Sequence, residues 1–78
     1  MQIQVNTTGI ISKKINRGRQ FVLELDKGDQ IADLITKLDI PEKELPFMMF
    51  YINGSNVRRD YILKAEDRVK ILPIVGGG

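Results

Sequence analysis

The chain ends in the segment 73–78, Pro-Ile-Val-Gly-Gly-Gly, so three glycines stand before the C-terminal carboxylate. Glycine adds no side-chain bulk and accepts nearly any backbone angle. Such an end could therefore be threaded through a narrow channel into the active site of another protein. We predict that the carboxylate itself is the reactive group. The alternative is an inert end, because chain termini are commonly disordered.

The other residues offer little conventional catalytic chemistry. The sequence has no His and no Cys, which excludes the usual metal cages and the Ser-His and Cys-His nucleophiles. Glu42 with Glu44, and Glu66 with Asp67, could be described as paired carboxylates, but such pairs more often solvate loops. The glycines before the tail are isolated and form no phosphate-binding loop. We therefore predict that the chain is not an enzyme and holds no cofactor or metal of its own.

Length and composition indicate one small folded domain. The chain has 78 residues, of which 42% are hydrophobic and 28% charged, near the lower size limit for burying a useful core. No apolar run approaches the roughly 20 residues that a bilayer-spanning helix needs. Residues 1–5 alternate and lack the continuous apolar core of a signal peptide. We expect a cytoplasmic protein.

The formal net charge is only +2, although basic residues gather in two places. These are Lys13, Lys14, Arg17 and Arg19, and then Arg58 and Arg59. Nucleic-acid surfaces are usually denser in charge and interleaved with stacking aromatics, and the first cluster has no aromatic residue until Phe21. A solvated loop is the simpler interpretation, and a docking surface for an acidic partner is the alternative.

Two strands are expected in the first third of the chain. Residues 2–8 and 20–26 alternate apolar and polar side chains, which is typical of half-buried strands. They are predicted to form a hairpin with a long connection. Residues 6–9 and 16–18 are turn candidates, and the path of residues 10–15 stays open.

One helix is predicted after the second strand. Gly28 stops the strand, and Asp29 is expected to supply the N-cap oxygen. The apolar stripe that follows has helical spacing and consists of Ile31, Leu34, Ile35 and Leu38. Pro41 ends the helix, because it disfavours the α conformation in the residue before it.

The second half of the chain returns to strands. Residues 47–52 are β-prone and precede Asn53-Gly54, a strong hairpin-turn signal. A short strand around residues 56–57 follows, then a buried helical turn or a packed loop at residues 61–63, and a last strand at residues 68–74. One helix packed on a mixed four- to five-stranded sheet buries these faces most simply. The predicted fold is α+β, a β-grasp, with residues 1–73 as the domain and residues 74–78 as a flexible tail.

Strand alternation also predicts an apolar patch. In each of the strands 47–52 and 68–74, every second side chain points away from the helix. If the two strands are neighbours, the outward side chains lie beside the tail: Met49, Tyr51, Leu72 and Ile74. Contiguous exposed apolar surface often marks a protein interface. An ordinary scatter of exposed apolar residues is the alternative.

Three stretches resemble the ThiS/MoaD sulfur-carrier family. They are Asn53-Gly54, the segment Asp-Arg-Val-Lys-Ile-Leu-Pro at residues 67–73, and the glycine tail. The helix start at Gly28-Asp29 also fits, less specifically. Members of this family are ubiquitin-like β-grasp proteins, so the resemblance implies the same fold here.

The resemblance also implies a mechanism and partners. An ATP-dependent activating enzyme adenylates the terminal glycine carboxylate, and a sulfur donor converts it to a thiocarboxylate. The sulfur then goes to an acceptor synthase in thiamine, molybdopterin or tRNA thiolation pathways. Gly78 is the expected modified residue, and Gly76 and Gly77 give the tail passage. The family ends in two glycines, so Gly76 and Gly77 are the alternative terminal pair.

The expected docking residues for the activating enzyme are Met49, Tyr51, Leu72 and Ile74, with Arg58, Arg59 and Arg68 at the rim. We expect the isolated chain to be monomeric. Some relatives are instead joined to lysines of other proteins, so a ubiquitin-like modifier is the alternative function. A β-grasp module that binds nucleic acid or protein, with an inert tail, is a third. The sequence does not identify the sulfur acceptor.

Overall fold

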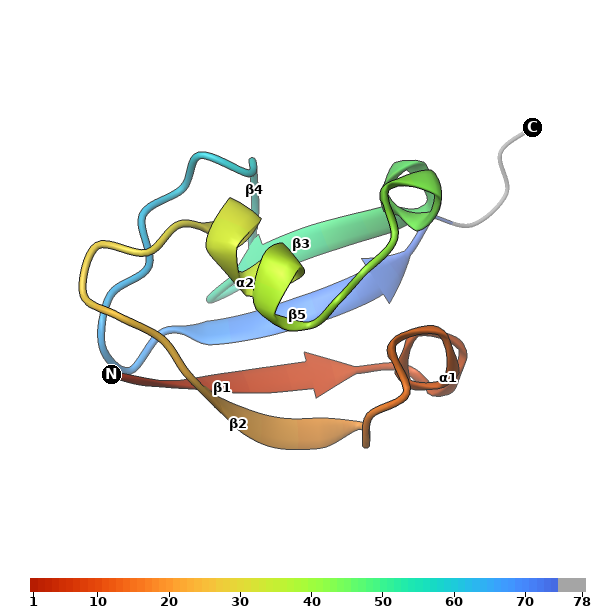
Figure 1. Ribbon diagram of the computed structural model, residues 1–78, viewed down its shortest axis with the longest axis horizontal. Helices are drawn as coiled ribbons and strands as arrows, with labels where there is room; N and C mark the ends of the chain where they lie inside the picture. The colour runs from red at the N-terminus through yellow and green to blue at the C-terminus, as the bar shows by residue number, and fades with distance from the viewer. Residues whose placement is uncertain (75–78) are drawn as a thin grey trace.

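Five β-prone segments form one mixed sheet in the computed structural model, which describes residues 1–74. They are β1 (Gln2–Thr7), β2 (Gln20–Glu24), β3 (Met48–Ile52), β4 (Ser55–Val57) and β5 (Arg68–Pro73). Their order is β2-β1-β5-β3-β4, with β1 and β5 parallel and all other neighbours antiparallel (Figure 1). The predicted α+β class and the mixed sheet are confirmed.

The core lies between this sheet and its helices. In the two central strands, Val5 of β1 and both Val69 and Ile71 of β5 have no exposed surface. Met48, Phe50 and Ile52 of β3 are also buried. Because side chains alternate across a strand, the opposite face of the sheet is left toward solvent. We call that side the outer face.

The helix α2 (Ile31–Lys37) lies over the inner face of the sheet (Figure 1). All four residues of the predicted stripe are buried. The predicted N-cap is wrong, because Gln30 occupies that position and Asp29 lies before it. The Asp29 carboxylate instead accepts a hydrogen bond from the Asp26 N–H at 2.9 Å. Asp33 accepts one from the Gln30 N–H at 2.7 Å, which satisfies the backbone at the start of the helix.

Two short helices were not anticipated. The helix α1 (Gly9–Ile15) fills the connection between β1 and β2, begins after Thr8 and ends at Asn16, whose φ of 57° is left-handed. The 3₁₀ helix η1 (Glu42–Phe47) precedes β3 and takes Phe47 from the predicted strand. Both sit at the end of the sheet where β5 finishes (Figure 1).

The hairpin turn is confirmed. Asn53 and Gly54 both have positive φ, 50° and 88°, the geometry of a type I′ turn. It joins β3 to β4 with Tyr51 opposite Asn56.

Residues 61–63 form a packed loop. Leu63 is buried, and its N–H donates to the Asp29 carbonyl at 2.8 Å. The buried Asp67 carboxylate accepts hydrogen bonds from the Lys64 N–H at 2.9 Å and from the Tyr61 hydroxyl at 3.3 Å. The Leu63 contact ties the loop between β4 and β5 to the body of the domain, and the two Asp67 contacts hold the loop together. Within residues 1–74, no helix is long and apolar enough to span a membrane.

Candidate functional site: an apolar strip beside the C-terminal tail

The pairing of β3 with β5 brings the predicted patch together. The two strands are neighbours, and Met49 lies directly opposite Leu72 on the outer face. Tyr51 lies opposite Lys70, the next outward position along the strand. Met49, Tyr51 and Leu72 are each partly exposed.

The pairing continues to the last described residue. The Ile74 N–H donates to the Phe47 carbonyl at 2.9 Å, so these two residues extend the register by one row. Ile74 is 46% exposed and Phe47 60% exposed. The outer-face strip therefore consists of Phe47, Met49, Tyr51, Leu72 and Ile74, and it leads to the point where the tail begins.

A hollow at the end of the strip adds a residue that sequence reasoning did not assign. It has a volume of about 560 Å³, and α1, η1 and β5 all border it. Ile10 of α1 lines it together with Phe47 and Ile74, and Ile10 is 60% exposed. The apolar pair at residues 10–11 was the available signal. Only the course of α1 shows that Ile11 is buried and that Ile10 faces this hollow.

An ion pair closes one side of the same hollow. Lys14 Nζ on α1 lies 2.9 Å from Glu44 Oε2 on η1. Both side chains are partly withdrawn from solvent, with 39% and 22% exposure. The pair joins the two short helices that flank the root of the tail.

The three predicted rim arginines lie in different places. Arg58 and Arg59 border a hollow that they share with Met49 and Ile74. Arg59 also lies 3.5 Å from Glu42 in an exposed ion pair. Arg68 lies at the far end of β5, where it lines a separate hollow with Gln4. Lys70, which sequence reasoning did not name, is the cation nearer the strip, because it faces Tyr51.

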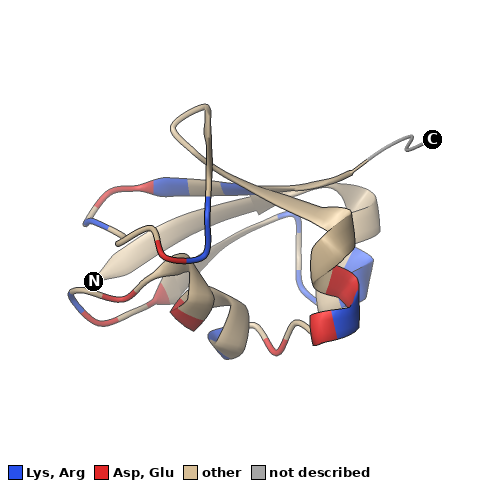
Figure 2. Ribbon diagram, turned by 90° about the horizontal axis from the view of Figure 1, so that it is seen from above, with Lys and Arg blue, Asp and Glu red and all other residues tan. Residues whose placement is uncertain are grey.

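The basic cluster at residues 13–19 does not form one free basic surface. Lys14 pairs with Glu44, and the Arg17 guanidinium lies over the Phe21 ring, 5.5 Å from its centroid. Figure 2 shows Lys and Arg interspersed with Asp and Glu along the loops and short helices. This mixture is unlike a nucleic-acid surface. The predicted loop is only partly right, because Lys13 and Lys14 lie in the last turn of α1.

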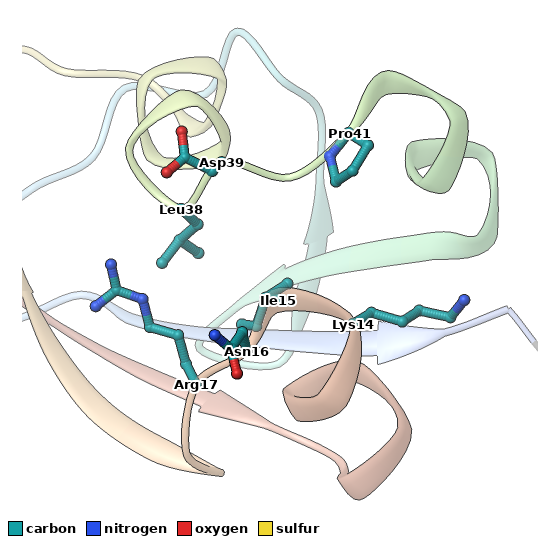
Figure 3. A pocket seen from close by; sticks show the side chains of 7 residues that line it. All are labelled: Lys14, Ile15, Asn16, Arg17, Leu38, Asp39 and Pro41. Carbon is teal, nitrogen blue, oxygen red and sulfur yellow. The ribbon is translucent and has the colours of Figure 1, made fainter.

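Another hollow lies between the C-terminal ends of α1 and α2 (Figure 3). Its charged side chains are Lys14, Arg17 and Asp39. In Figure 3 Lys14 points away from the other two, so these groups do not converge on one point. Among residues 1–74, no group of three potential ligands could hold a metal ion.

The surroundings of Tyr61 perturb its phenol. Burial raises the pKa of Tyr61, and the neighbouring Asp67 carboxylate raises it further by charge repulsion and by accepting a hydrogen bond from the hydroxyl. Tyr61 belongs to the packed loop, so the shift serves the fold.

The predicted reactive residues, Gly76, Gly77 and Gly78, lie outside the described part of the chain. The structure does place the residues from which the tail extends. The chain leaves β5 at Pro73 and Ile74, beside α1 and η1 (Figure 1). Any group attached to the tail is therefore tethered at the end of the outer-face strip.

Several solved structures share this architecture across nearly the whole chain. SAMP1 from Haloferax volcanii has a TM-score of 0.77 at 14% identity, with all of both chains covered. A putative molybdopterin converting factor subunit 1 from Pyrococcus furiosus has a TM-score of 0.78 at 22% identity, covering 96% of this chain and 99% of that one.

A chain from a protein–protein complex of subunits 1 and 2 of molybdopterin-converting factor from Helicobacter pylori has a TM-score of 0.69 at 22% identity, with all of both chains covered. These likenesses show the ubiquitin-like β-grasp fold. In sequence, no curated protein matches the chain. The model of the ThiS family does match, over residues 11–78. Because that match covers most of the sequence, the chain belongs to the ThiS family.

Proposed function

We propose that this protein is a sulfur carrier whose C-terminal glycine carboxylate is adenylated by an ATP-dependent partner and then converted to a thiocarboxylate. The observation that carries the proposal is the continuity of the outer-face strip with the root of the glycine tail. Ile74 belongs to the strip and is also the last described residue. A partner bound to the strip would hold the tail close to its own active site.

The chemistry explains why the tail has no side chains at its end. A carboxylate is a poor acyl donor until it becomes a mixed anhydride. In the proposed first step, a carboxylate oxygen attacks the α-phosphorus of ATP, and pyrophosphate leaves. In the second, a sulfur donor at the oxidation level of sulfide attacks the acyl carbon, AMP leaves with the bonding electrons, and loss of the proton from sulfur gives the thiocarboxylate. The four residues after Ile74 span at most about 14 Å, so the activating site must lie close to the docked strip.

This chain supplies the docking surface and the acyl group, and the partner enzyme catalyses the reaction. ATP is then a substrate of the activating enzyme, and the carrier needs no cofactor of its own. Membership of the ThiS family supports this division of labour. The H. pylori structure, in which a protein of the same fold is part of a two-subunit complex, supports docking to a partner protein. The acceptor belongs to a thiamine, molybdopterin or tRNA thiolation pathway.

A ubiquitin-like modifier is the second candidate function. The observation that favours it is the close overlap in fold with SAMP1 and with a structure named as small archaeal modifier protein 1 from Haloferax volcanii. Such a modifier would share the adenylation step. It would end instead in an isopeptide bond, formed when a lysine amine displaces AMP from the same acyl carbon.

Intact-mass spectrometry separates the two candidates. The full chain is incubated with a cognate activating enzyme, ATP and a sulfur donor, and target proteins from the same cells are digested in parallel. A carrier gains about 16 Da at its C-terminus, because one oxygen is replaced by sulfur. A modifier instead leaves a branched C-terminal remnant of this chain on lysines of other proteins; after tryptic digestion the branch is residues 71–78, because Lys70 is the last basic residue. Failure to find either product would overturn both candidates.

The same experiment identifies the terminal glycine pair. A variant that lacks Gly78 ends in Gly76-Gly77. If the family's two-glycine ending is the functional one, this shortened chain is charged at least as well as the full chain. If Gly78 is the modified residue, the shortened chain is charged more slowly.

A further inference from the structure

The free edge of β2 has a defined hydrogen-bonding pattern. At its ends, the Thr7 N–H donates to the Arg19 carbonyl at 2.7 Å, and the Leu25 N–H donates to the Met1 carbonyl at 2.8 Å. Antiparallel pairs alternate between residues that exchange main-chain hydrogen bonds and residues that do not. The register of β1 against β2 then fixes which residues direct their N–H and C=O groups away from β1: Gln20, Val22 and Glu24.

The two edges of the sheet differ. At one edge, β4 has only three residues, and very short edge strands resist pairing. At the other edge, β2 has five residues with no Pro and no Lys, and its register with β1 is continuous. Val22 on its outer face is 58% exposed. Figure 1 shows no described segment alongside this edge.

The side chains of β2 complement themselves. When a second copy of the strand is placed antiparallel and centred on Val22, that residue lies opposite its own counterpart. Gln20 then lies opposite Glu24, and the half-buried Phe21 lies opposite Leu23. The Val22 pair and the Phe21–Leu23 pair are apolar, and the side chains of Gln20 and Glu24 can hydrogen-bond. Cross-strand pairs of these kinds stabilise sheets.

One pair of charges at the two ends of the strand also matches. Arg19 precedes β2 and Asp26 follows it, and both side chains are exposed. Antiparallel pairing centred on Val22 places Arg19 of one copy one row from Asp26 of the other. Glu24 adds no free charge, because it lies 3.6 Å from the Met1 ammonium, and the exposed Arg17 and Lys27 lie opposite each other in this register. The electrostatic match therefore rests on Arg19 and Asp26.

We propose that β2 pairs antiparallel with β2 of a second copy of this chain, which joins two five-stranded sheets into one continuous sheet. The three outward residues of each strand provide about six main-chain hydrogen bonds. The contact is small, so the dimer is weak and forms at high protein concentration. It departs from the expectation of a monomer, and it goes beyond the carrier function.

The dimer leaves the outer-face strip free. The strip lies on β3 and β5, and β1 separates it from β2. The two-fold axis of such a pair runs perpendicular to the sheet, so both strips face the same side and the two tails leave at opposite ends. Each copy can therefore still meet a charging partner.

Sedimentation velocity from about 0.01 to about 1 mM tests the proposal, because weak contacts of this size associate in that range. The wild-type sedimentation coefficient is expected to rise with concentration. Val22→Lys places two lysines opposite each other and is expected to weaken association at least about tenfold. The matched control is Gln4→Lys, which adds the same charge on the same face one strand further in and is expected to associate like wild type.

Charge-reversal variants test whether the partner that pairs with β2 is a second copy of this chain. Arg19→Glu and Asp26→Lys each reverse one end of the strand, and each variant alone is expected to associate more weakly. An equimolar mixture of the two is expected to recover association, because each copy again meets an opposite charge. Amide exchange should slow with concentration at Gln20, Val22 and Glu24. A wild-type sedimentation coefficient that stays constant to 1 mM, equal effects of Val22→Lys and Gln4→Lys, or no recovery in the mixture would each overturn the proposal.

Discussion

Replacing Ile74 with alanine tests the docking role of the outer-face strip. Ile74 is 46% exposed and lies beyond the end of β5, so the domain does not depend on its side chain for packing. Its backbone N–H still donates to the Phe47 carbonyl after the substitution. We expect the free energy of unfolding to change by less than about 0.5 kcal/mol, as for other surface substitutions.

The expected loss of binding follows from the surface that docking would cover. The side-chain surface that Ile74 still exposes contributes about 1–2 kcal/mol when it is buried, at about 25 cal/mol per Å². Removing most of it with Ile74→Ala should weaken binding of the activating enzyme about five- to tenfold. Titration calorimetry measures the dissociation constant, and ATP–pyrophosphate exchange at low carrier concentration measures the functional consequence.

Ile62→Ala is the matched control. Ile62 is 55% exposed, but it lies in the packed loop at the opposite end of the molecule from the tail (Figure 1). The two variants remove the same atoms from similarly exposed positions. If Ile74→Ala binds like wild type, or if Ile62→Ala loses as much affinity, the strip is not the docking surface.

Three further predictions concern the tail, the core and the loop. Gly77→Ala should slow adenylation while the thermal midpoint stays unchanged, because the added methyl group would obstruct the channel; an unchanged exchange rate would count against a narrow channel. Leu34→Ala should lower the free energy of unfolding by about 2–5 kcal/mol in urea, because Leu34 is fully buried; a loss below about 1 kcal/mol would contradict its place in the core. The raised pKa of Tyr61 favours the neutral phenol in the fold, so this stabilisation is complete below the ordinary pKa of about 10 and is lost as the pH rises through the folded value. Tyr61→Phe should therefore reduce the fall in the free energy of unfolding at alkaline pH. If that fall is unchanged in the variant, it arises from groups other than Tyr61.

Periodicity predicted the parts of the fold that depend on one repeating pattern. The stripe of α2 and the alternation in β3 and β5 each repeat over several residues, so the buried face followed directly. The shared outer face of Met49 and Leu72 required only that β3 and β5 be neighbours, whereas their direct pairing depends on the register of the two strands. The turn at Asn53-Gly54 was predictable because few residues adopt positive φ at both central positions.

The missed features depend on contacts that the local sequence does not contain. The helix α1 buries only Ile11 and Ile15, and a stripe of two residues cannot be distinguished from a loop. Short helices are marginal without tertiary packing. The N-cap of α2 is Gln30 and not the predicted Asp29, because the Asp29 carboxylate accepts a hydrogen bond from the Asp26 N–H. Arg68 was predicted at the rim of the strip, but Lys70 lies between Arg68 and Leu72 on the outer face of β5.

The central claim is that the C-terminal carboxylate is the group that the activating enzyme adenylates. The most direct measurement is ATP–pyrophosphate exchange by the activating enzyme with the full chain and with the same chain ending in a carboxamide. The amide changes only the terminal group and leaves the strip and the glycines in place. Exchange should proceed with the carboxylate form and stop with the carboxamide. Equal exchange with both forms would show that the enzyme activates some other group.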